Sequence, residues 1–358
     1  MNSASSDSVL AKVEEFDARG DHDEAINVLA RATQAGDRIA KTRLGMRLLV
    51  GDRAPYLPRE GAEFILEAAR EGISEAVALV AVFQGIGIYQ DKNWNQALNT
   101  LAYAAALGLE SAREQLVLLS DTGEPASDQG LLTNPDTDFW TRYPAKIDLQ
   151  QWLSSPPGTT LNDNPLIKSF QNFLPAPVCR RLIRLSGARL KPALVYDAVN
   201  KRNYQSPTRT NSIAEFNLVE NDLINFLIQE RMSAACGVPM TQFEGTAILN
   251  YQPGQEISDH FDFVDQDLPN YQQEISENGQ RIITFLIYLN EDYSNGETVF
   301  PKLGITHKGQ AGEGLYFVNA LANGDSDLRS LHAGTPPLNG EKWIVSQFIR
   351  NRVVKYIL

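Results

Sequence analysis

The chain has 358 residues, 43% of them hydrophobic and 21% charged, a mixture typical of globular proteins and unlike disordered or collagen-like chains. Since a domain has roughly 150 residues, this length predicts two domains with connecting chain. The 44 acidic and 32 basic residues give a formal charge of −12, which argues against nucleic acid and anionic membranes as partners. The first residues lack a signal-peptide pattern and no apolar run approaches the ~20 residues of a membrane span, so we expect a cytoplasmic protein.

An internal repeat with a period of 36 residues occupies the N-terminal third of the chain. Three columns are identical in each unit: Ala32, Ala68 and Ala104; Gly36, Gly72 and Gly108; Ala40, Ala76 and Ala112. Each unit shows helical spacing on both sides of its glycine, which predicts a pair of helices joined at a glycine cap. The pattern resembles Sel-like repeats, relatives of the tetratricopeptide family, over residues 8–120. The resemblance implies a surface on which a protein or peptide partner docks, and the alternative is an array that only caps or dimerises the second domain.

The periodicity ends after residue 120, where prolines are scattered among Gly, Ser, Asp and Thr. We therefore predict a linker over residues 121–164. Four aromatic residues in this range, Phe139, Trp140, Tyr143 and Trp152, indicate that part of it packs against a neighbour.

A second domain is expected over residues 165–354. It begins with helical patterns near 176–185 and 220–235, and strands then dominate, at 246–251, 282–289, 314–319 and 343–350. Strands separated by Gly, Pro, Asn and Asp clusters predict a sandwich or barrel. The expected fold class is thus α+β and multidomain, a helical repeat solenoid followed by a strand-rich domain.

Candidate metal ligands lie in this second domain. His260 and Asp262 are two residues apart, so on an extended strand both side chains point to one face. His332 follows 72 residues after His260, and Lys342 another ten residues later. Two imidazoles and one carboxylate are typical of non-haem Fe(II) oxygenases, although zinc hydrolases use the same ligand types. Lys342 favours the oxygenase, because an ammonium beside an apolar strand needs an anion and a dicarboxylate cosubstrate supplies one.

The motifs around these residues occur in one order along the chain: TAILNYQPG at 246–254, HFD at 260–262, RIITFLIYLN at 281–290, GETVFP at 296–301 and LHAGTPPLNGEKW at 331–343. Together they resemble prolyl 4-hydroxylase-type dioxygenases dependent on Fe(II) and 2-oxoglutarate, from about residue 167 to 352. The resemblance implies a double-stranded β-helix, or jelly roll, with flanking helices.

The same resemblance implies roles for nine residues. His260, Asp262 and His332 are the expected catalytic metal ligands. Lys342, Tyr251, Thr284 and Tyr288 are expected to bind 2-oxoglutarate, and Arg209 and Arg281 to contact a substrate, unless these two arginines are structural ion-pair partners. Fe(II), 2-oxoglutarate, O2 and the reductant ascorbate are the expected cofactors.

The implied reaction is hydroxylation of an unactivated C–H bond, coupled to decarboxylation of 2-oxoglutarate, on a prolyl residue of a protein that the repeats recruit. Phe348 stands where the family commonly has a second tryptophan, and Asn295 where a glycine often precedes GET. A free amino acid or another small molecule is the alternative substrate. In an alternative of a different class, the protein is a repeat-based adaptor whose oxygenase domain is a non-catalytic sensor.

Overall fold

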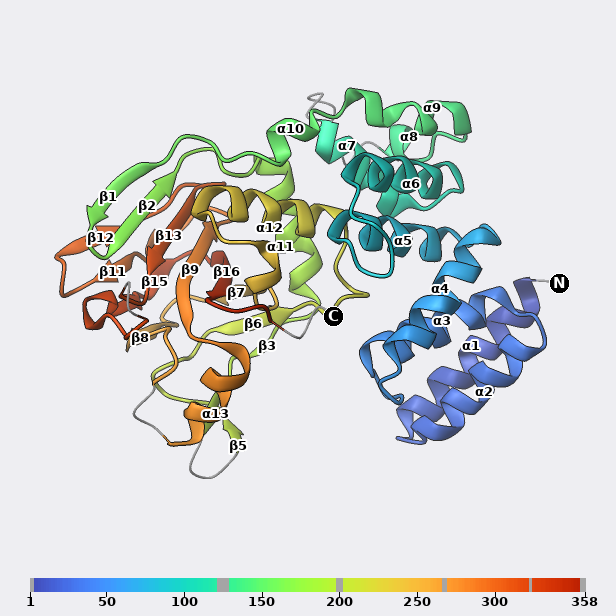
Figure 1. Ribbon diagram of the computed structural model, residues 1–358, viewed down its shortest axis with the longest axis horizontal. Coiled ribbons are helices and arrows are strands. Elements are labelled where there is room, and N and C mark those ends of the chain that lie inside the picture. Colours follow the sequence, from blue (N-terminus) through green and yellow to red (C-terminus); the bar gives the residue numbers. More distant parts are fainter. Residues whose placement is uncertain (1–2, 121–128, 198–201, 266–268, 322–323, 355–358) are drawn as a thin grey trace. The chain divides into compact units, whose positions relative to one another are not determined.

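The computed structural model describes residues 3–120, 129–197, 202–265, 269–321 and 324–354. It divides into two compact units (Figure 1). We call Met1–Gln151 with Asn217–Ile228 the helical unit, and Trp152–Phe216 with Gln229–Leu358 the sheet unit. Among the described residues, no helix is both long and apolar enough to cross a membrane.

The helical unit confirms the predicted repeat. Its helices are α1 (Ser3–Ala18), α2 (His22–Gln34), α3 (Arg38–Val50), α4 (Pro58–Arg70), α5 (Ser74–Ile86), α6 (Trp94–Ala106) and α7 (Glu110–Ser120). Helices α2, α4 and α6 each begin 36 residues apart, and so do α3, α5 and α7. Gly36, Gly72 and Gly108 follow α2, α4 and α6 with φ of 88°, 81° and 97°. This left-handed conformation costs glycine little and other residues more, which explains the repeated glycine.

Small residues allow neighbouring helices of the repeat to pack closely. A Cβ added to Gly61 on α4 would lie 2.5 Å from the backbone nitrogen of Leu49 on α3. Ala40, Ala76 and Ala112, which share one repeat column, are at most 1% exposed. The columns found in the sequence therefore mark helix–helix contacts.

Residues 121–164, expected to be a linker, contain several regular elements. Residues 121–128 lie outside the described residues. Beyond them are α8 (Gln129–Leu132), α9 (Thr137–Thr141), a 3-10 helix (Tyr143–Lys146), α10 (Leu149–Trp152) and β1 (Thr159–Asp163). Trp140 and Tyr143 are fully buried and stack with ring centroids 5.5 Å apart. Aromatic burial thus gives this range a small core, as its four aromatic residues had indicated.

The sheet unit contains two facing antiparallel sheets (Figure 1). The larger has the order β1-β2-β13-β9-β16-β7-β6-β3 and the smaller the order β12-β11-β14-β8. The larger sheet comprises β1, β2 (Leu166–Phe170), β3 (Lys191–Pro192), β6 (Ser212–Glu215), β7 (Ala247–Tyr251), β9 (Arg281–Tyr288), β13 (Gly314–Val318) and β16 (Lys342–Arg350). The smaller comprises β8 (Ile257–His260), β11 (Thr298–Phe300), β12 (Ile305–His307) and β14 (His332–Gly334). Phe300 of the smaller sheet packs edge-on against Phe317 of the larger, with centroids 5.1 Å apart, so the core lies between the sheets.

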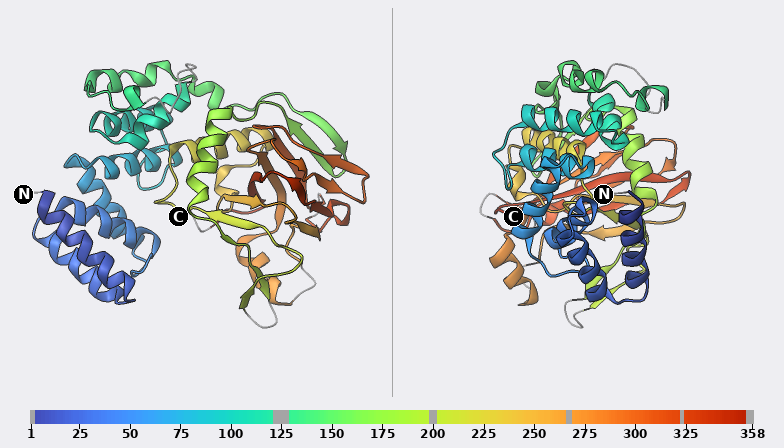
Figure 2. Two further views of the ribbon diagram at one scale, coloured as in Figure 1. Left: turned by 180° about the vertical axis from the view of Figure 1, so that it is seen from behind. Right: turned by 90° about the vertical axis from the view of Figure 1, so that its right-hand side faces the viewer.

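The remaining elements surround the sheets. They are the pairs β4 (Val195–Asp197) with β5 (Arg202–Tyr204) and β10 (Ser294–Asn295) with β15 (Pro337–Asn339), the helices α11 (Ala176–Gly187), α12 (Leu223–Cys236) and α13 (Pro269–Asn278), and 3-10 turns at Met240–Gln242 and Leu328–Ser330. Figure 2 shows α11 running beside the strands of the larger sheet. Repeat helices followed by a jelly-roll domain with flanking helices confirm the expected fold class.

Candidate metal centre

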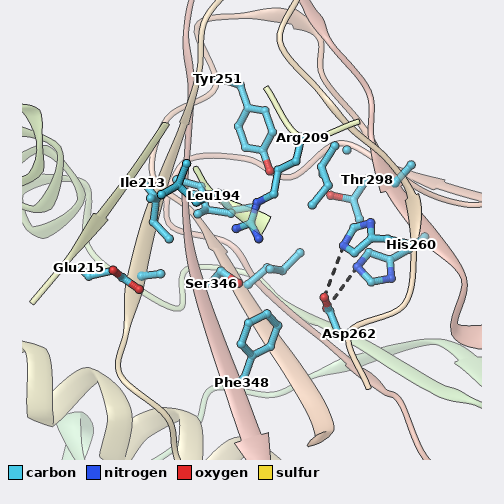
Figure 3. Close-up of a pocket in the computed structure, with 18 of the residues that line it drawn as sticks. Leu194, Arg209, Ile213, Glu215, Tyr251, His260, Asp262, Thr298, Ser346 and Phe348 are labelled. Atoms are coloured by element: carbon cyan, nitrogen blue, oxygen red, sulfur yellow. Dashed lines mark ion pairs between the residues drawn. The ribbon is translucent and has the colours of Figure 1, made fainter. Parts of the chain in front are cut away.

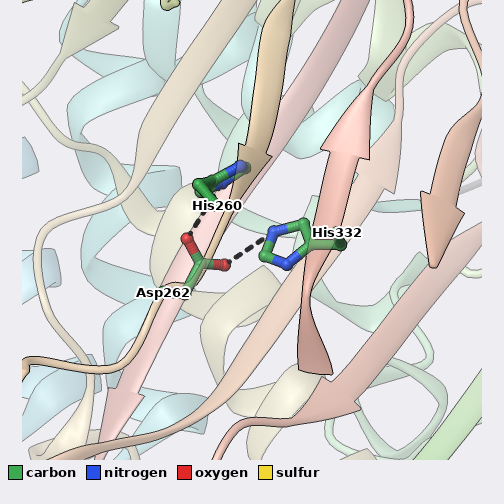
Figure 4. Close-up of side chains that lie close together, drawn as sticks. All are labelled: His260, Asp262 and His332. Atoms are coloured by element: carbon green, nitrogen blue, oxygen red, sulfur yellow. Dashed lines mark ion pairs between the residues drawn. The ribbon is translucent and has the colours of Figure 1, made fainter. Parts of the chain in front are cut away.

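Three candidate ligands converge at one end of the smaller sheet (Figure 4). His260 ends β8 and lies opposite His332, the first residue of β14, in the β8–β14 ladder. Asp262 follows β8, and its two carboxylate oxygens lie 3.4 Å from His260 Nε2 and 3.2 Å from His332 Nε2. One ligand atom from each residue falls within 4.8 Å of the others. The ladder and the two-residue step of the strand therefore bring together the three residues that the sequence singled out.

Both imidazoles have the same backbone partner, the carbonyl two residues earlier. His260 Nδ1 lies 2.9 Å from the oxygen of Ser258, and His332 Nδ1 lies 3.0 Å from that of Ser330. A carbonyl only accepts hydrogen bonds, so each Nδ1 carries a proton, and Nε2, on the side of Asp262, is the ring nitrogen that can bind a metal. This arrangement orients histidines that bind metals.

Asp262 is held as a carboxylate by its surroundings. Burial alone would raise its pKa, but the neighbouring imidazoles of His332 and His260 hold that pKa well below its usual range. Burial lowers the pKa of His260, and the Asp262 carboxylate more than offsets this, so the pKa of His260 is raised. Two Nε2 lone pairs and an ionised carboxylate fit a divalent metal of the non-haem iron type.

Thr284, which was expected to bind 2-oxoglutarate, contacts Asp262 and does not line the cavity. Its hydroxyl donates to Asp262 Oδ2 at 2.7 Å and accepts from Nδ2 of Asn319 at 2.9 Å. All three side chains are buried, and Thr284 is absent from the lining of the adjacent cavity. A hydroxyl fixed by two hydrogen bonds orients the carboxylate and has no proton left to donate to a cosubstrate.

A cavity of about 530 Å³ opens beside the three ligands (Figure 3). Its lining includes the three ligands together with Arg209, Tyr251, Arg281, Thr298, Lys342 and Phe348. Leu249, Leu286 and Ile344 supply apolar walls. The cavity therefore combines a metal-binding end with walls of mixed polar and apolar side chains, among them a few cations.

Lys342 is the deepest of these cations, at 2% exposure. It lies opposite Tyr251 in the β7–β16 ladder, and its Nζ lies 5.2 Å from the Tyr251 ring centroid and 5.7 Å from that of Tyr288. Burial lowers the pKa of Lys342 to about 8, although the charge of Glu297 acts in the opposite direction. Among the described residues it forms no ion pair, so an anion entering the cavity would find it available.

Tyr288 lies behind the cavity wall, where it contacts Thr298 as well as Lys342. Tyr288 is fully buried and does not line the cavity, and its hydroxyl donates to Thr298 Oγ1 at 2.8 Å. Thr298 lines the cavity, and since its oxygen already accepts a hydrogen bond, its own proton is free for an acceptor beside Lys342. The sequence analysis missed Thr298. The sequence feature that could have identified Thr298 was its position two residues before Phe300, because this spacing places both side chains on the inward face of β11.

The two candidate substrate arginines differ in their surroundings. Arg281 donates from Nε and Nη2 to both carboxylate oxygens of Glu244, at 2.7 and 2.9 Å, and stacks 3.9 Å from the Phe348 ring centroid. Arg281 is thus a structural ion-pair partner at the cavity wall. Arg209 points into the cavity (Figure 3), and its buried Nε has no hydrogen-bond partner among the described residues. Of these two arginines, Arg209 is the one whose guanidinium forms no ion pair with the described residues.

Comparisons with known proteins agree with this geometry. Residues 246–350 match the 2OG-Fe(II) oxygenase superfamily. The chain is 30% identical to prolyl 4-hydroxylase 1 of Arabidopsis thaliana over 203 residues, 53% of this chain and 70% of that protein. It is 28% identical to probable prolyl 4-hydroxylase 7 of the same plant over 209 residues, 53% of this chain and 64% of the relative.

Two solved structures are similar to separate parts of the chain. The viral collagen prolyl hydroxylase of Paramecium Bursaria Chlorella virus-1, in complex with 2OG, is 24% identical with a TM-score of 0.41, and the match covers 53% of this chain and 98% of that one. A Sel1 repeat protein from Oxalobacter formigenes is 21% identical with a TM-score of 0.26, and the match covers 36% of this chain and 52% of that one.

Proposed function

This chain belongs to the prolyl 4-hydroxylase family of 2OG-Fe(II) oxygenases, and from that premise we propose that it hydroxylates a prolyl residue of a protein or peptide. When bound, iron, O2 and 2-oxoglutarate supply the oxidation of a C–H bond to C–OH, with 2-oxoglutarate converted to succinate and CO2, and ascorbate keeps the metal reduced. The observation that carries the proposal is a set of three converging ligands at one end of a cavity and an unpaired, buried Lys342 on its wall.

The chain's own residues perform the positioning in this reaction. His260, Asp262 and His332 hold the metal, and Thr284 fixes the orientation of the carboxylate. The Lys342 ammonium and the free proton of Thr298 bind the distal carboxylate of 2-oxoglutarate. Leu249, Leu286 and Ile344 on the cavity wall lower the polarity around these groups, which strengthens their electrostatic interactions.

Arg209 supplies the substrate contact. Its guanidinium points into the cavity and offers N–H donors, which suit the carbonyl oxygens of a peptide backbone. Because Arg281 is already bound to Glu244, substrate recognition at this wall depends on Arg209. A peptide that carries the reacting residue fits this arrangement.

The helical unit recruits the protein that carries this residue. Tyr103 on α6 and Tyr56 before α4 are 48% and 60% exposed, and exposed aromatic side chains are common anchors of protein contacts. In a test of this role, Tyr103→Ser should raise KM for an intact protein substrate and leave KM for a short peptide unchanged. Equal KM values for wild type and variant with the intact protein would remove Tyr103 from the recruiting surface.

The direct test of the proposed reaction incubates the purified full chain with Fe(II), ascorbate and labelled 2-oxoglutarate, with and without a pool of proline-containing peptides. We expect succinate release that rises with the peptides, and a product peptide heavier by one oxygen atom on a proline. His260→Ala is the matched inactive control. Iron-loaded wild-type protein that releases no succinate under either condition would contradict the enzymatic function, and an oxygen found only on other residues would contradict the prolyl assignment.

A further inference from the structure

A second histidine–carboxylate pair lies behind the cavity, separate from the metal ligands. His307 ends β12 and Glu313 precedes β13, and His307 Nε2 lies 3.1 Å from Glu313 Oε1. Their side chains are 15% and 3% exposed. The other oxygen of Glu313 accepts the backbone N–H of Gln310 at 3.0 Å, inside the same turn. The pair therefore closes the segment 307–313 with a buried contact between an imidazole and a carboxylate.

This segment encloses the ring of Tyr288 on β9. The ring centroids of His307 and Tyr288 are 5.7 Å apart. At Gly309 the backbone approaches the ring so closely that an added Cβ would lie 2.0 Å from Tyr288 Cδ2. The backbone N–H of Tyr288 donates to the carbonyl of Glu313 at 2.9 Å. The position of the Tyr288 ring thus depends on the position of the segment 307–313.

Tyr288 in turn contacts both groups assigned to the distal carboxylate of 2-oxoglutarate. Its hydroxyl donates to Thr298 Oγ1, and its ring centroid is 5.7 Å from Lys342 Nζ. A second connection runs through the backbone, because Thr298 lies opposite His307 in the β11–β12 ladder. The His307–Glu313 pair is therefore connected to the cavity wall in two ways, through the Tyr288 ring and through the β11–β12 ladder.

We propose that His307 and Glu313 are positioning residues for the 2-oxoglutarate subsite, which they shape by fixing the segment 307–313 against Tyr288. The proposal rests on the proposed function, since it takes the ligand beside Lys342 and Thr298 to be 2-oxoglutarate. An imidazole–carboxylate contact suits this role, because the attraction between two buried polar groups is little weakened by water. Loss of one partner removes the contact between the two ends of the segment 307–313, which leaves the segment free to move.

The test measures binding by calorimetry on the full chain loaded with Co(II). His307→Ala and Glu313→Ala should each raise the Kd of 2-oxoglutarate roughly tenfold, because each removes the contact that closes the segment 307–313, and leave the Kd of Co(II) within about twofold of wild type. The double variant with glutamine at both positions should recover most of the affinity, because two amides of similar length can hydrogen-bond without a buried charge. His22→Ala is the matched control, since His22 also contacts a carboxylate, that of Asp17, in the helical unit.

A double-mutant cycle distinguishes positioning from a general loss of stability. Tyr288→Phe keeps the ring and removes its hydrogen bond to Thr298. If His307 acts through Tyr288, the combined variant should lose less affinity than the product of the two single losses. In turnover assays, KM for 2-oxoglutarate should rise while kcat at saturating 2-oxoglutarate stays near the wild-type value.

Three outcomes would overturn the proposal: an unchanged Kd of 2-oxoglutarate in both single variants, losses that simply multiply in the cycle, or an equal loss of Co(II) affinity. If a single variant fails to fold, the double variant with glutamine at both positions and Tyr288→Phe still test the proposal. The proposal requires that the double variant binds 2-oxoglutarate and that Tyr288→Phe binds it more weakly than wild type. Wild-type protein that binds no 2-oxoglutarate would refute the proposed function itself, whereas normal binding by wild type and variants alike would refute only the positioning role.

Discussion

Lys342 and Tyr251 face each other across the β7–β16 ladder, and the ammonium lies 5.2 Å from the centre of the phenol ring. The ring partly stabilises the buried cation without neutralising it, because a cation–π contact is weaker than an ion pair. The ammonium therefore remains available to a carboxylate that enters the cavity. The affinity of the cavity for a dicarboxylate should therefore depend on the charge of Lys342.

Lys342→Met should raise the Kd of 2-oxoglutarate by at least about a hundredfold, because a buried carboxylate loses its counter-charge at a cost of about 3 kcal/mol. Methionine has a similar length and leaves no cavity. Co(II) titration of the same variant should match wild type, since Lys342 is not a ligand. A variant that binds 2-oxoglutarate as tightly as wild type would place the distal carboxylate elsewhere.

The affinity for 2-oxoglutarate should fall as the pH rises above 8. Burial lowers the pKa of Lys342 to about 8, so the ammonium is present below this pH and is lost above it. Since only the charged form attracts a carboxylate, Kd should rise about tenfold per pH unit above the free-state pKa. Calorimetry at pH 7, 8 and 9 on the Co(II)-loaded protein measures this. Lys342→Met, which has nothing to titrate there, should show a flat profile.

Thr284→Val should weaken metal binding by about tenfold, because Asp262 loses the hydroxyl that orients it. The exchange keeps the shape of the side chain, and the readout is the Kd of Co(II) by competition with a chelator. Thr306→Val, at an exposed position of β12, is the matched control and should leave that Kd unchanged. If Thr284 bound 2-oxoglutarate instead, the variant would keep its metal affinity and lose cosubstrate affinity.

Arg209→Gln should raise KM for a peptide substrate by about tenfold while the Kd of 2-oxoglutarate stays at its wild-type value. The reason is that Arg209 has a free guanidinium at the substrate side, and a charged hydrogen bond contributes about 1.5 kcal/mol or more. Steady-state kinetics with variable peptide gives the first value and calorimetry the second. A rise in the Kd of 2-oxoglutarate instead of KM for peptide would assign Arg209 to the cosubstrate.

Arg281→Gln should act mainly on stability, with a loss of about 2 kcal/mol in the free energy of unfolding. Arg281 forms a two-bond ion pair with Glu244, which also accepts from Arg350. Urea unfolding of the full chain measures the loss, and Arg352→Gln, at an exposed site, is the control. A stable Arg281→Gln protein with a raised KM for peptide would restore the substrate role of this arginine.

The sequence predicted the features that depend on spacing along the chain. The 36-residue repeat could be recognised from its glycines, because Gly36, Gly72 and Gly108 all adopt the same left-handed backbone conformation. His260 and Asp262 could be paired because a strand repeats every two residues. These local rules hold regardless of the tertiary fold.

The roles of the inner hydroxyl groups could not be predicted in the same way. Thr284, Tyr288 and Thr298 are all buried residues on strands, and spacing alone cannot tell which one reaches the cavity. That depends on cross-strand partners: Thr284 meets Asp262, whereas Tyr288 meets Thr298. The short helices of the range 129–152 were not predicted for a similar reason, because its aromatic residues pack without any periodic pattern.

The constant 36-residue spacing of the helix pairs in the helical unit has an evolutionary consequence. Because each junction repeats the same left-handed glycine and the same small residues, one 36-residue segment can be duplicated or deleted with every remaining junction intact. The number of helix pairs can then vary by recombination while the oxygenase ligands stay unchanged.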